Sequence, residues 1–292
     1  MRFKFKRTKR GALPNARPAD LSSPEAVEKE KSPQKKRRKP SWPFILMVSL
    51  SLAAFIISMG FLIPQLLDYY NAAQESKKIQ QGSVSDVAES GYHIINYENL
   101  LSTNKEFVAW MDVPGTNISY PVVYPTGSHA NNDYYLHRNF NLNSSVEGAL
   151  FVDYRSPKGF DNYNVVIYGH RLTSGTMFTQ LDKFQKESFW QDYPEVHLYT
   201  PDGILIYKVF SSYMAPIDDD CYTFRFPGSG EFVKWAQKMA DNSNYKTGIV
   251  PGPDDATILL STCVPRSIAD RTNFRYVTLA VLDHTEPNPV AA

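Results

Sequence analysis

The stretch ATILLSTCVPRSIADRTNFRYVTLAVLD, residues 256–283, contains two apolar runs separated by a polar connection, and it includes one of the chain's two cysteines. Short runs rich in Ile, Leu, Val and Tyr that are bounded by polar loops are typical of β-strands. The stretch therefore predicts two strands. Cys263 lies where the first strand ends, and Arg275 lies where the second begins.

The same alternation of short apolar runs and polar turns recurs upstream, after Pro114-Gly115. Short runs rich in Val, Ile, Tyr and Phe alternate with turn signals at residues 117–124, 148–154, 164–169, 195–200 and 204–214. Asp202-Gly203, between the last two runs, is a hairpin signal. Seven or eight short strands with few long helices indicate a β-barrel or a β-sandwich.

Two other segments, one before Pro114 and one after it, have helical spacing instead. Residues 97–111 carry Leu100, Leu101, Phe107 and Trp110 and predict one or two short helices. Residues 230–242 place apolar side chains at i, i+3, i+4 and i+7, the pattern of an amphipathic helix; these are Phe232, Trp235, Ala236 and Met239. This second helix precedes the strand that ends in the cysteine.

The N-terminal segment carries a strong positive charge. Residues 1–42 hold 14 Lys and Arg against 4 Asp and Glu, a net charge of +10, and because the whole chain is +1, the rest carries −9. The segment is rich in Pro, Ser and charge, with too little apolar content for a core, so we predict that it is disordered. Its positive charge favours contact with anionic phospholipid headgroups.

An uncharged apolar run of 21 residues follows, from Pro43 to Ile63. At 1.5 Å per residue it spans roughly 30 Å, the thickness of the bilayer interior. A cleavable signal peptide has a shorter apolar region, of about 7–15 residues. The run predicts an uncleaved anchor at residues 43–66 and a stalk helix at 67–88. The basic block at residues 35–39 predicts a cytoplasmic N-terminus and an outer domain beyond residue 67.

Cys221 and Cys263 are the only cysteines, and a domain outside the cell permits a disulfide between them. A domain of roughly 200 residues buries enough surface to be stable without a disulfide. A disulfide also leaves the residues around Cys263 unexplained. We therefore expect a free Cys263 and a packed Cys221 thiol, although spacing alone leaves the pairing open.

His170 occupies a position comparable to that of Cys263, because it follows the apolar run at 164–169 and lies just past a strand end. Strand ends on one barrel rim can meet in space. A thiolate is a strong nucleophile and an imidazole can exchange its proton, while an arginine can stabilise an oxyanion. Arg275 is the candidate for that role, and Arg266 and Arg271 in the connection are alternatives.

These residues carry a family resemblance. YGHR at 168–171, LSTC at 260–263 and RYV at 275–277 resemble the His, Cys and Arg signatures of sortases, membrane-anchored cysteine transpeptidases of Gram-positive bacteria. Further segments are similar to class B sortases in particular, and the helix before the cysteine strand resembles one that class B enzymes insert there; the segments are 110–124, 131–140, 147–155 and 168–184. The similarity covers about residues 90 to 283.

Two departures from the family pattern are visible. Leu259 stands where the family usually has the first Thr of Thr-Leu-x-Thr-Cys, and Arg275 lies slightly farther from the cysteine than usual. The resemblance implies a mainly β fold, a closed barrel of about eight strands with N-terminal helices and the inserted helix. The catalytic domain is expected at residues 89–284, followed by a C-terminal tail at 285–292.

The resemblance also implies a reaction. Cys263 attacks the carbonyl after Thr in a C-terminal sorting motif of the LPxTG or NPxTx type, His170 protonates the departing amine, and Arg275 holds the substrate and the oxyanion. An amine then resolves the thioester. In wall anchoring the amine belongs to a peptidoglycan precursor, and in pilus assembly it is a pilin lysine. A hydrolytic cysteine peptidase and a non-catalytic binding domain are the rival hypotheses.

By match to class B positions, five side chains are expected to contact the sorting peptide: Asn132, Leu136, Tyr168, Ser261 and Thr262. No cofactor and no metal site are expected. The three consecutive aspartates at 218–220 are more typical of a solvated loop than of a calcium site.

Overall fold

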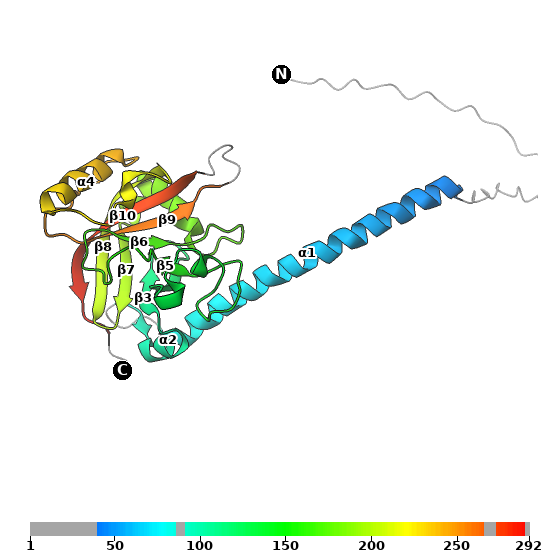
Figure 1. Ribbon diagram of the computed structural model, residues 1–292, viewed down its shortest axis with the longest axis horizontal. Coiled ribbons are helices and arrows are strands. Elements are labelled where there is room, and N and C mark those ends of the chain that lie inside the picture. Colours follow the sequence, from blue (N-terminus) through cyan, green and yellow to red (C-terminus); the bar gives the residue numbers. More distant parts are fainter. Residues whose placement is uncertain (1–39, 86–90, 266–272, 290–292) are drawn as a thin grey trace, which may run out of the picture. The chain divides into compact units, whose positions relative to one another are not determined.

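The computed structural model describes residues 40–85, 91–265 and 273–289. The chain divides into two compact units, residues 1–54 and 55–292, and the second contains the barrel. In the described part, eight strands close a barrel in the order β10-β8-β7-β3-β4-β5-β6-β9 (Figure 1). The strands are β3 Phe107–Asp112, β4 Ser119–Val123, β5 Leu150–Val152, β6 Val165–Tyr168, β7 Glu195–Thr200, β8 Gly203–Pro216, β9 Thr257–Cys263 and β10 Phe274–Glu286.

The predicted barrel is confirmed. The hairpin signal at Asp202-Gly203 joins β7 to β8, which pair antiparallel with Thr200 opposite Gly203. Most barrel pairs are antiparallel, but β6 pairs with β9 in parallel, and so does β4 with β5. Side chains from all eight strands fill the interior, and Met177 and Phe178 also pack into this core.

The prediction of one or two short helices at residues 97–111 is correct for the first half of the segment only. Residues 97–103 form the helix α2 Tyr97–Thr103, whereas Phe107 begins the strand β3. The side chains of Phe107 and Trp110 are buried on the outer side of the barrel, where they pack with Leu100 of α2. The apolar side chains of α2 and β3 pack into the same cluster, so their combined spacing in the sequence resembles that of one helix. These side chains are Leu100, Leu101, Phe107 and Trp110.

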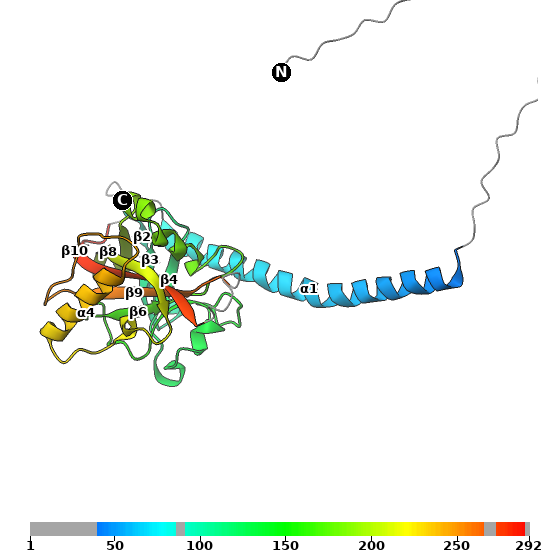
Figure 2. The same cartoon turned by 90° about the horizontal axis from the view of Figure 1, so that it is seen from above.

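The predicted amphipathic helix is confirmed as α4 Ser229–Asn242, which comes between β8 and β9 in the chain. Phe232, Trp235 and Met239 are buried against the outer face of the barrel, on Leu259 of β9 and Val277 of β10. Figure 2 shows α4 alongside β8, β9 and β10. The cysteine strand is therefore covered on both faces until its last residue.

The remaining elements are short apart from one helix. They are the helix α3 Glu187–Asp192, the strand pair β1 Val84–Ser85 and β2 Ile94–Ile95, and four 3-10 helices: η1 Gly127–His129, η2 Tyr134–Leu136, η3 Phe178–Gln185 and η4 Asp220–Tyr222. The exception is α1 Trp42–Ser83, a single helix of 42 residues.

Helix α1 covers both the predicted anchor and most of the predicted stalk. It is long and apolar enough to be a candidate membrane span by length and composition. The basic block at residues 35–39 lies outside the described residues, and β10 runs to Glu286, past the predicted domain boundary at 284. The division into cytoplasmic, anchor, stalk, catalytic and tail segments stays a prediction.

Candidate active site

The ends of two neighbouring strands bring His170 and Cys263 to the same rim of the barrel. Because β6 and β9 are parallel, with Tyr168 opposite Ser261, both strands end at this rim (Figure 1). The backbone N–H of Gly169 donates to the carbonyl of Ser261 at 3.2 Å and extends the pairing by one residue. His170 follows Gly169 directly, and Cys263 lies two residues after Ser261 as the last residue of β9.

Arg275 lies directly opposite Cys263 in the antiparallel pairing of β9 with β10. Residues directly opposite each other project from the same face of a sheet. In β9, Ile258 and Leu260 point into the barrel, whereas Leu259 packs on the outer face under α4. The alternation therefore places Cys263 and Arg275 together on the outer face. Cys263 is exposed.

Two predicted peptide contacts next to Cys263 are buried. The Ser261 side chain is on the outer face and shares a hydrogen bond of 2.9 Å with the Tyr222 hydroxyl. Thr262 points the other way, is only 2% exposed, and its hydroxyl has no hydrogen-bond partner among the described residues. Contact of either residue with a peptide stays a prediction.

A backbone carbonyl fixes the orientation of the His170 ring. Nε2 of His170 lies 2.8 Å from the carbonyl oxygen of Leu136, which ends the short 3-10 helix η2. A carbonyl oxygen only accepts, so Nε2 must carry a hydrogen and donate it. Nδ1 is then the ring nitrogen that remains for proton exchange. Leu136, predicted as a peptide contact, thus contacts the histidine through its backbone.

Asp153, which is not among the site residues predicted from the sequence, binds two that are, Asn132 and Tyr168. Its carboxylate is fully buried. It accepts hydrogen bonds from Asn132 Nδ2 at 2.7 Å, from the Tyr168 hydroxyl at 3.1 Å, and from the Arg155 guanidinium at 2.7 and 3.0 Å. Asn132 and Tyr168 are thereby held in one network.

The network also fixes protonation states. The hydrogen bonds to Asp153 raise the pKa of Arg155 above its usual value. Burial, followed by the Asp153 charge, raises the pKa of Tyr168. Both groups therefore stay protonated at neutral pH and act as hydrogen-bond donors. An aspartate at the end of a buried strand with an arginine two positions later was the available sequence signal.

A groove of about 360 Å³ opens beside Arg275 on this outer face. Its lining residues are Arg155, Tyr168, Ile217, Asp218, Asp219, Tyr222, Phe224 and Arg275. The rings of Tyr168 and Tyr222 stack with their centroids 6.3 Å apart. Burial raises the pKa of Tyr222, while the Arg275 charge acts in the opposite direction. The groove combines aromatic walls with two guanidinium groups, which suits an extended peptide that carries a polarised carbonyl.

The two cysteines have opposite properties. Both are free, so the Cys221–Cys263 disulfide is absent from the structure. Burial, with a contribution from the Asp219 charge, raises the pKa of Cys221 well above its usual value. A thiol that stays protonated is a poor nucleophile. Cys221 is a packed thiol, and only Cys263 is open to a substrate.

Cys221→Ser is therefore expected to leave the rate of peptide transfer within about two-fold of wild type, because serine nearly matches the size of cysteine and the buried Cys221 thiol takes no part in the proposed chemistry. Steady-state transfer assays on both proteins measure this. Loss of transfer in Cys221→Ser, with the fold intact, would show that the second thiol participates.

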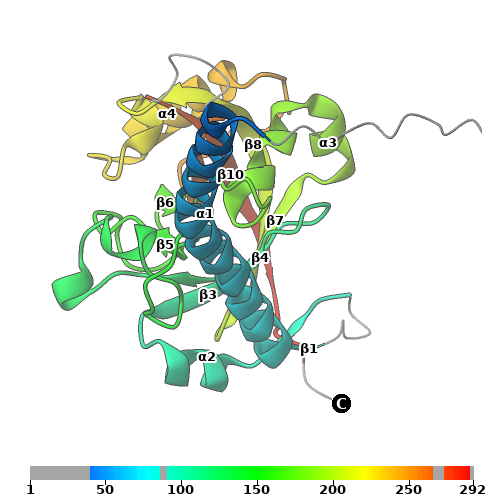
Figure 3. The ribbon, with the colours of Figure 1, turned by 90° about the vertical axis from the view of Figure 1, so that its right-hand side faces the viewer.

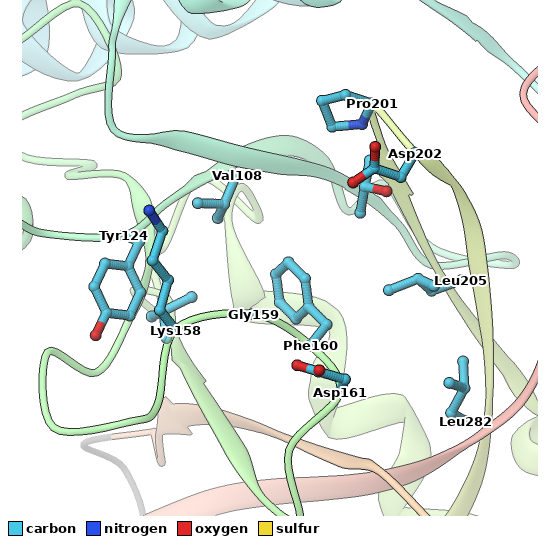
Figure 4. A pocket seen from close by; sticks show the side chains of 12 residues that line it. Val108, Tyr124, Lys158, Gly159, Phe160, Asp161, Pro201, Asp202, Leu205 and Leu282 are labelled. Carbon is cyan, nitrogen blue, oxygen red and sulfur yellow. The ribbon is translucent and has the colours of Figure 1, made fainter.

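Another cavity, of about 540 Å³, lies at the opposite mouth of the barrel. Val152 at the end of β5, Leu205 early in β8 and Leu282 late in β10 contribute to its apolar wall, and Figure 4 shows Phe160 among them with Lys158 and Asp161 nearby. None of the predicted site residues lines it. Among the described residues, no group of three or more His, Cys, Asp or Glu could hold a metal ion.

Comparison with known proteins agrees with this arrangement. A family model of the sortase domain matches residues 111–283. Sortase B of Listeria monocytogenes is 32% identical over 167 residues, which is 56% of this chain and 65% of that protein, just under two thirds. Sortase B of Staphylococcus aureus is 26% identical over 75% of this chain and 89% of its own length.

A solved structure extends the agreement to the fold. The crystal structure of sortase B from B. anthracis in complex with AAEK1 superposes with a TM-score of 0.61 at 28% identity, over 74% of this chain and 98% of that one. This chain therefore belongs to the sortases, a family of cysteine transpeptidases, and within that family it is a class B sortase.

Proposed function

We propose that this sortase cleaves a C-terminal sorting motif of the LPxTG or NPxTx type after its Thr, through a thioester on Cys263, and transfers the protein to an amine of a cell wall precursor. The observation that carries the proposal is the shared rim of the barrel. There Cys263 ends β9 opposite Arg275, and His170 follows the end of the neighbouring strand β6. A nucleophile, a proton carrier and a permanent cation at one strand end suit acyl transfer.

In the first step, the Cys263 thiolate forms a bond to the carbonyl carbon of the motif's Thr. The peptide C–N bond breaks, and a proton from His170 Nδ1 passes to the departing nitrogen. Nε2 keeps its hydrogen because it donates to the Leu136 carbonyl. In the second step, the acceptor amine attacks the thioester carbonyl, loses its proton to His170, and releases Cys263 as the thiolate.

Arg275 stabilises the oxyanion that forms in both steps. Its guanidinium is permanently charged and offers several donors, and its position opposite Cys263 puts it near the carbonyl under attack. Arg271, the alternative from the sequence, lies outside the described residues. The groove beside Arg275 receives the peptide, and Tyr168 is the proposed contact that lines it. The other proposed contacts lie outside its lining: Asn132, Leu136, Ser261 and Thr262.

The proposed partners are surface proteins with a C-terminal sorting signal, together with a peptidoglycan precursor. Helix α1 supports this choice as a candidate membrane span. A single span with a cytoplasmic N-terminus would hold the enzyme beside exported substrates and lipid-linked acceptors. Such confinement raises the effective concentration of each partner.

This topology predicts that protease added to wall-stripped cells removes the outer domain and leaves a short membrane-bound stub. The reason is that the charge of the segment before the helix keeps it in the cytoplasm. Immunoblotting with an N-terminal tag measures the stub. A mature protein that begins after residue 67 would contradict the prediction.

A panel of acceptor amines tests the transfer step. The full chain in detergent is incubated with a sorting peptide and with cross-bridge peptides, a pilin-type lysine peptide, or no amine. Ligated product with a cross-bridge peptide supports wall anchoring, and a marked preference for the lysine peptide would assign pilus assembly instead. Fast hydrolysis with no ligated product for any amine would overturn the transpeptidase proposal.

A further inference from the structure

Glu147 is a buried carboxylate that the proposed chemistry does not use. Its side chain belongs to a residue only 1% exposed, just before β5. The Ser76 hydroxyl donates to Oε2 at 3.0 Å, and the Thr176 hydroxyl donates to Oε1 at 2.8 Å. A buried carboxylate is unfavourable unless its oxygens accept hydrogen bonds. Here each oxygen accepts from a different segment of the chain.

The first of these segments is the end of α1. Ser76 lies in the part of that helix that belongs to the same compact unit as the barrel. There Ile79 packs against the outer core, and the Glu75 carboxylate accepts a hydrogen bond from Asn139. Figure 3 shows this part of α1 passing in front of the barrel near β4, and Ser76 of α1 lines one small cavity together with Tyr120 of β4. The last turns of α1 are thus part of the folded unit.

The second segment is the loop that begins at His170. The backbone N–H of Phe178 donates to the His170 carbonyl at 3.0 Å, and Arg171 pairs with Met177 in an antiparallel bridge. The two ends of the loop are therefore paired with each other, and Thr176 is the loop residue next to the paired Met177. A hydrogen bond that fixes Thr176 also restrains the backbone from which the His170 ring projects.

The residue after Glu147 lies directly against that ring. Gly148 has a positive φ of +62°, and a Cβ there would be 2.6 Å from the Tyr135 carbonyl oxygen, 2.9 Å from the Leu136 carbonyl oxygen and 3.1 Å from His170 Cδ2. Leu136 is the residue whose carbonyl accepts the Nε2 hydrogen of His170. The backbone held by Glu147 thus supports both the ring and its acceptor.

We propose that Glu147 is a positioning residue for His170, and that it couples the histidine to the end of helix α1. The Glu147 carboxylate accepts hydrogen bonds from Ser76 of helix α1 and from Thr176 of the loop that begins at His170. The next residue, Gly148, lies against the His170 ring. The proposal rests on the proposed function in one respect, the role of His170 in proton transfer. It makes the end of α1 part of the catalytic apparatus as well as the connection to the membrane.

The test uses the full chain in detergent and three variants, Glu147→Ala, Glu147→Gln and Ser76→Ala. A misplaced proton carrier lowers kcat, so Glu147→Ala is expected to lose on the order of 10- to 100-fold in kcat with KM within about two-fold. Glu147→Gln should recover most of the loss, because an amide of the same shape accepts one hydroxyl hydrogen and donates to the other oxygen. Ser76→Ala, which removes one hydrogen bond, should lie between wild type and Glu147→Ala.

The histidine itself supplies the second measurement. Nitrogen-15 NMR of labelled histidine is expected to show one His170 tautomer with hydrogen on Nε2 in the wild type, and averaged tautomers in Glu147→Ala. Glu98→Ala, which removes an exposed carboxylate of α2, is the matched control and should change neither quantity. If Glu147→Ala fails to fold, Ser76→Ala supplies the same two measurements.

An unchanged kcat and an unchanged His170 tautomer in Glu147→Ala would overturn the positioning role while leaving the proposed function intact. A fall in kcat with an unchanged tautomer and no recovery in Glu147→Gln would also overturn it, since that pattern indicates a general loss of stability. Full activity of His170→Ala would instead contradict the proposed function, and the NMR measurement would still decide whether Glu147 positions the ring.

Discussion

Cys263→Ala is expected to abolish both cleavage of a sorting peptide and formation of ligated product, while the protein keeps its fold. Cys263 is the exposed last residue of β9, so loss of its sulfur removes the nucleophile without removing a core contact. Exposed substitutions of this kind usually change stability by less than about 0.5 kcal/mol. Peptide cleavage followed by chromatography, with a thermal melt of the same sample, measures both effects.

His170→Ala is expected to share this phenotype, with a loss in kcat of about 10²- to 10⁴-fold, the usual contribution of a positioned general acid. The matched control is His284→Ala, because His284 is a half-exposed histidine near the far end of β10 whose ring lies beside the carboxylates of Asp283 and Glu286. Normal turnover in Cys263→Ala, or equal losses in the two histidine variants, would contradict the proposed roles.

Arg275→Lys is the second large effect, with an expected fall in kcat of about 10²- to 10³-fold, the range measured when one oxyanion donor is removed. A lysine keeps the charge but has a single ammonium group, which cannot reproduce the planar, several-donor guanidinium. KM for the sorting peptide should change less than kcat, because the lost interaction is strongest in the transition state.

The same substitution at an exposed arginine is the control for Arg275→Lys. Arg225→Lys makes that change at an arginine with no ion pair among the described residues, and its kcat should stay near wild type. Normal kcat in Arg275→Lys together with loss of activity in Arg271→Ala would move the oxyanion role to the connecting loop.

The sequence predicted secondary structure correctly where the apolar spacing comes from a single helix or strand. Helix α4 follows from its own spacing of Phe232, Trp235 and Met239, and the two strands around Cys263 follow from their apolar runs. The sequence misled at β3, because Phe107 and Trp110 pack with Leu100 from a neighbouring helix and their joint spacing looks helical.

The sequence marks Asp153 only by its place at a strand end with Arg155 two positions later. The roles of the supporting residues depend on partners far along the chain, which no local pattern specifies. Asp153 matters because Asn132 and Tyr168 both donate to it. Glu147 matters because hydroxyls from positions 76 and 176 reach it. The tautomer of His170 likewise depends on the carbonyl of Leu136, which no sequence pattern specifies.

Intact mass spectrometry of the full chain after brief incubation with a sorting peptide tests the central claim most directly. The account predicts a mass increase equal to the peptide fragment that ends in Thr, located on Cys263 by digestion and absent from Cys263→Ala. Addition of a cross-bridge amine should discharge the adduct into ligated peptide. An adduct on another residue, or peptide cleavage with no adduct on Cys263 at any time, would contradict the account.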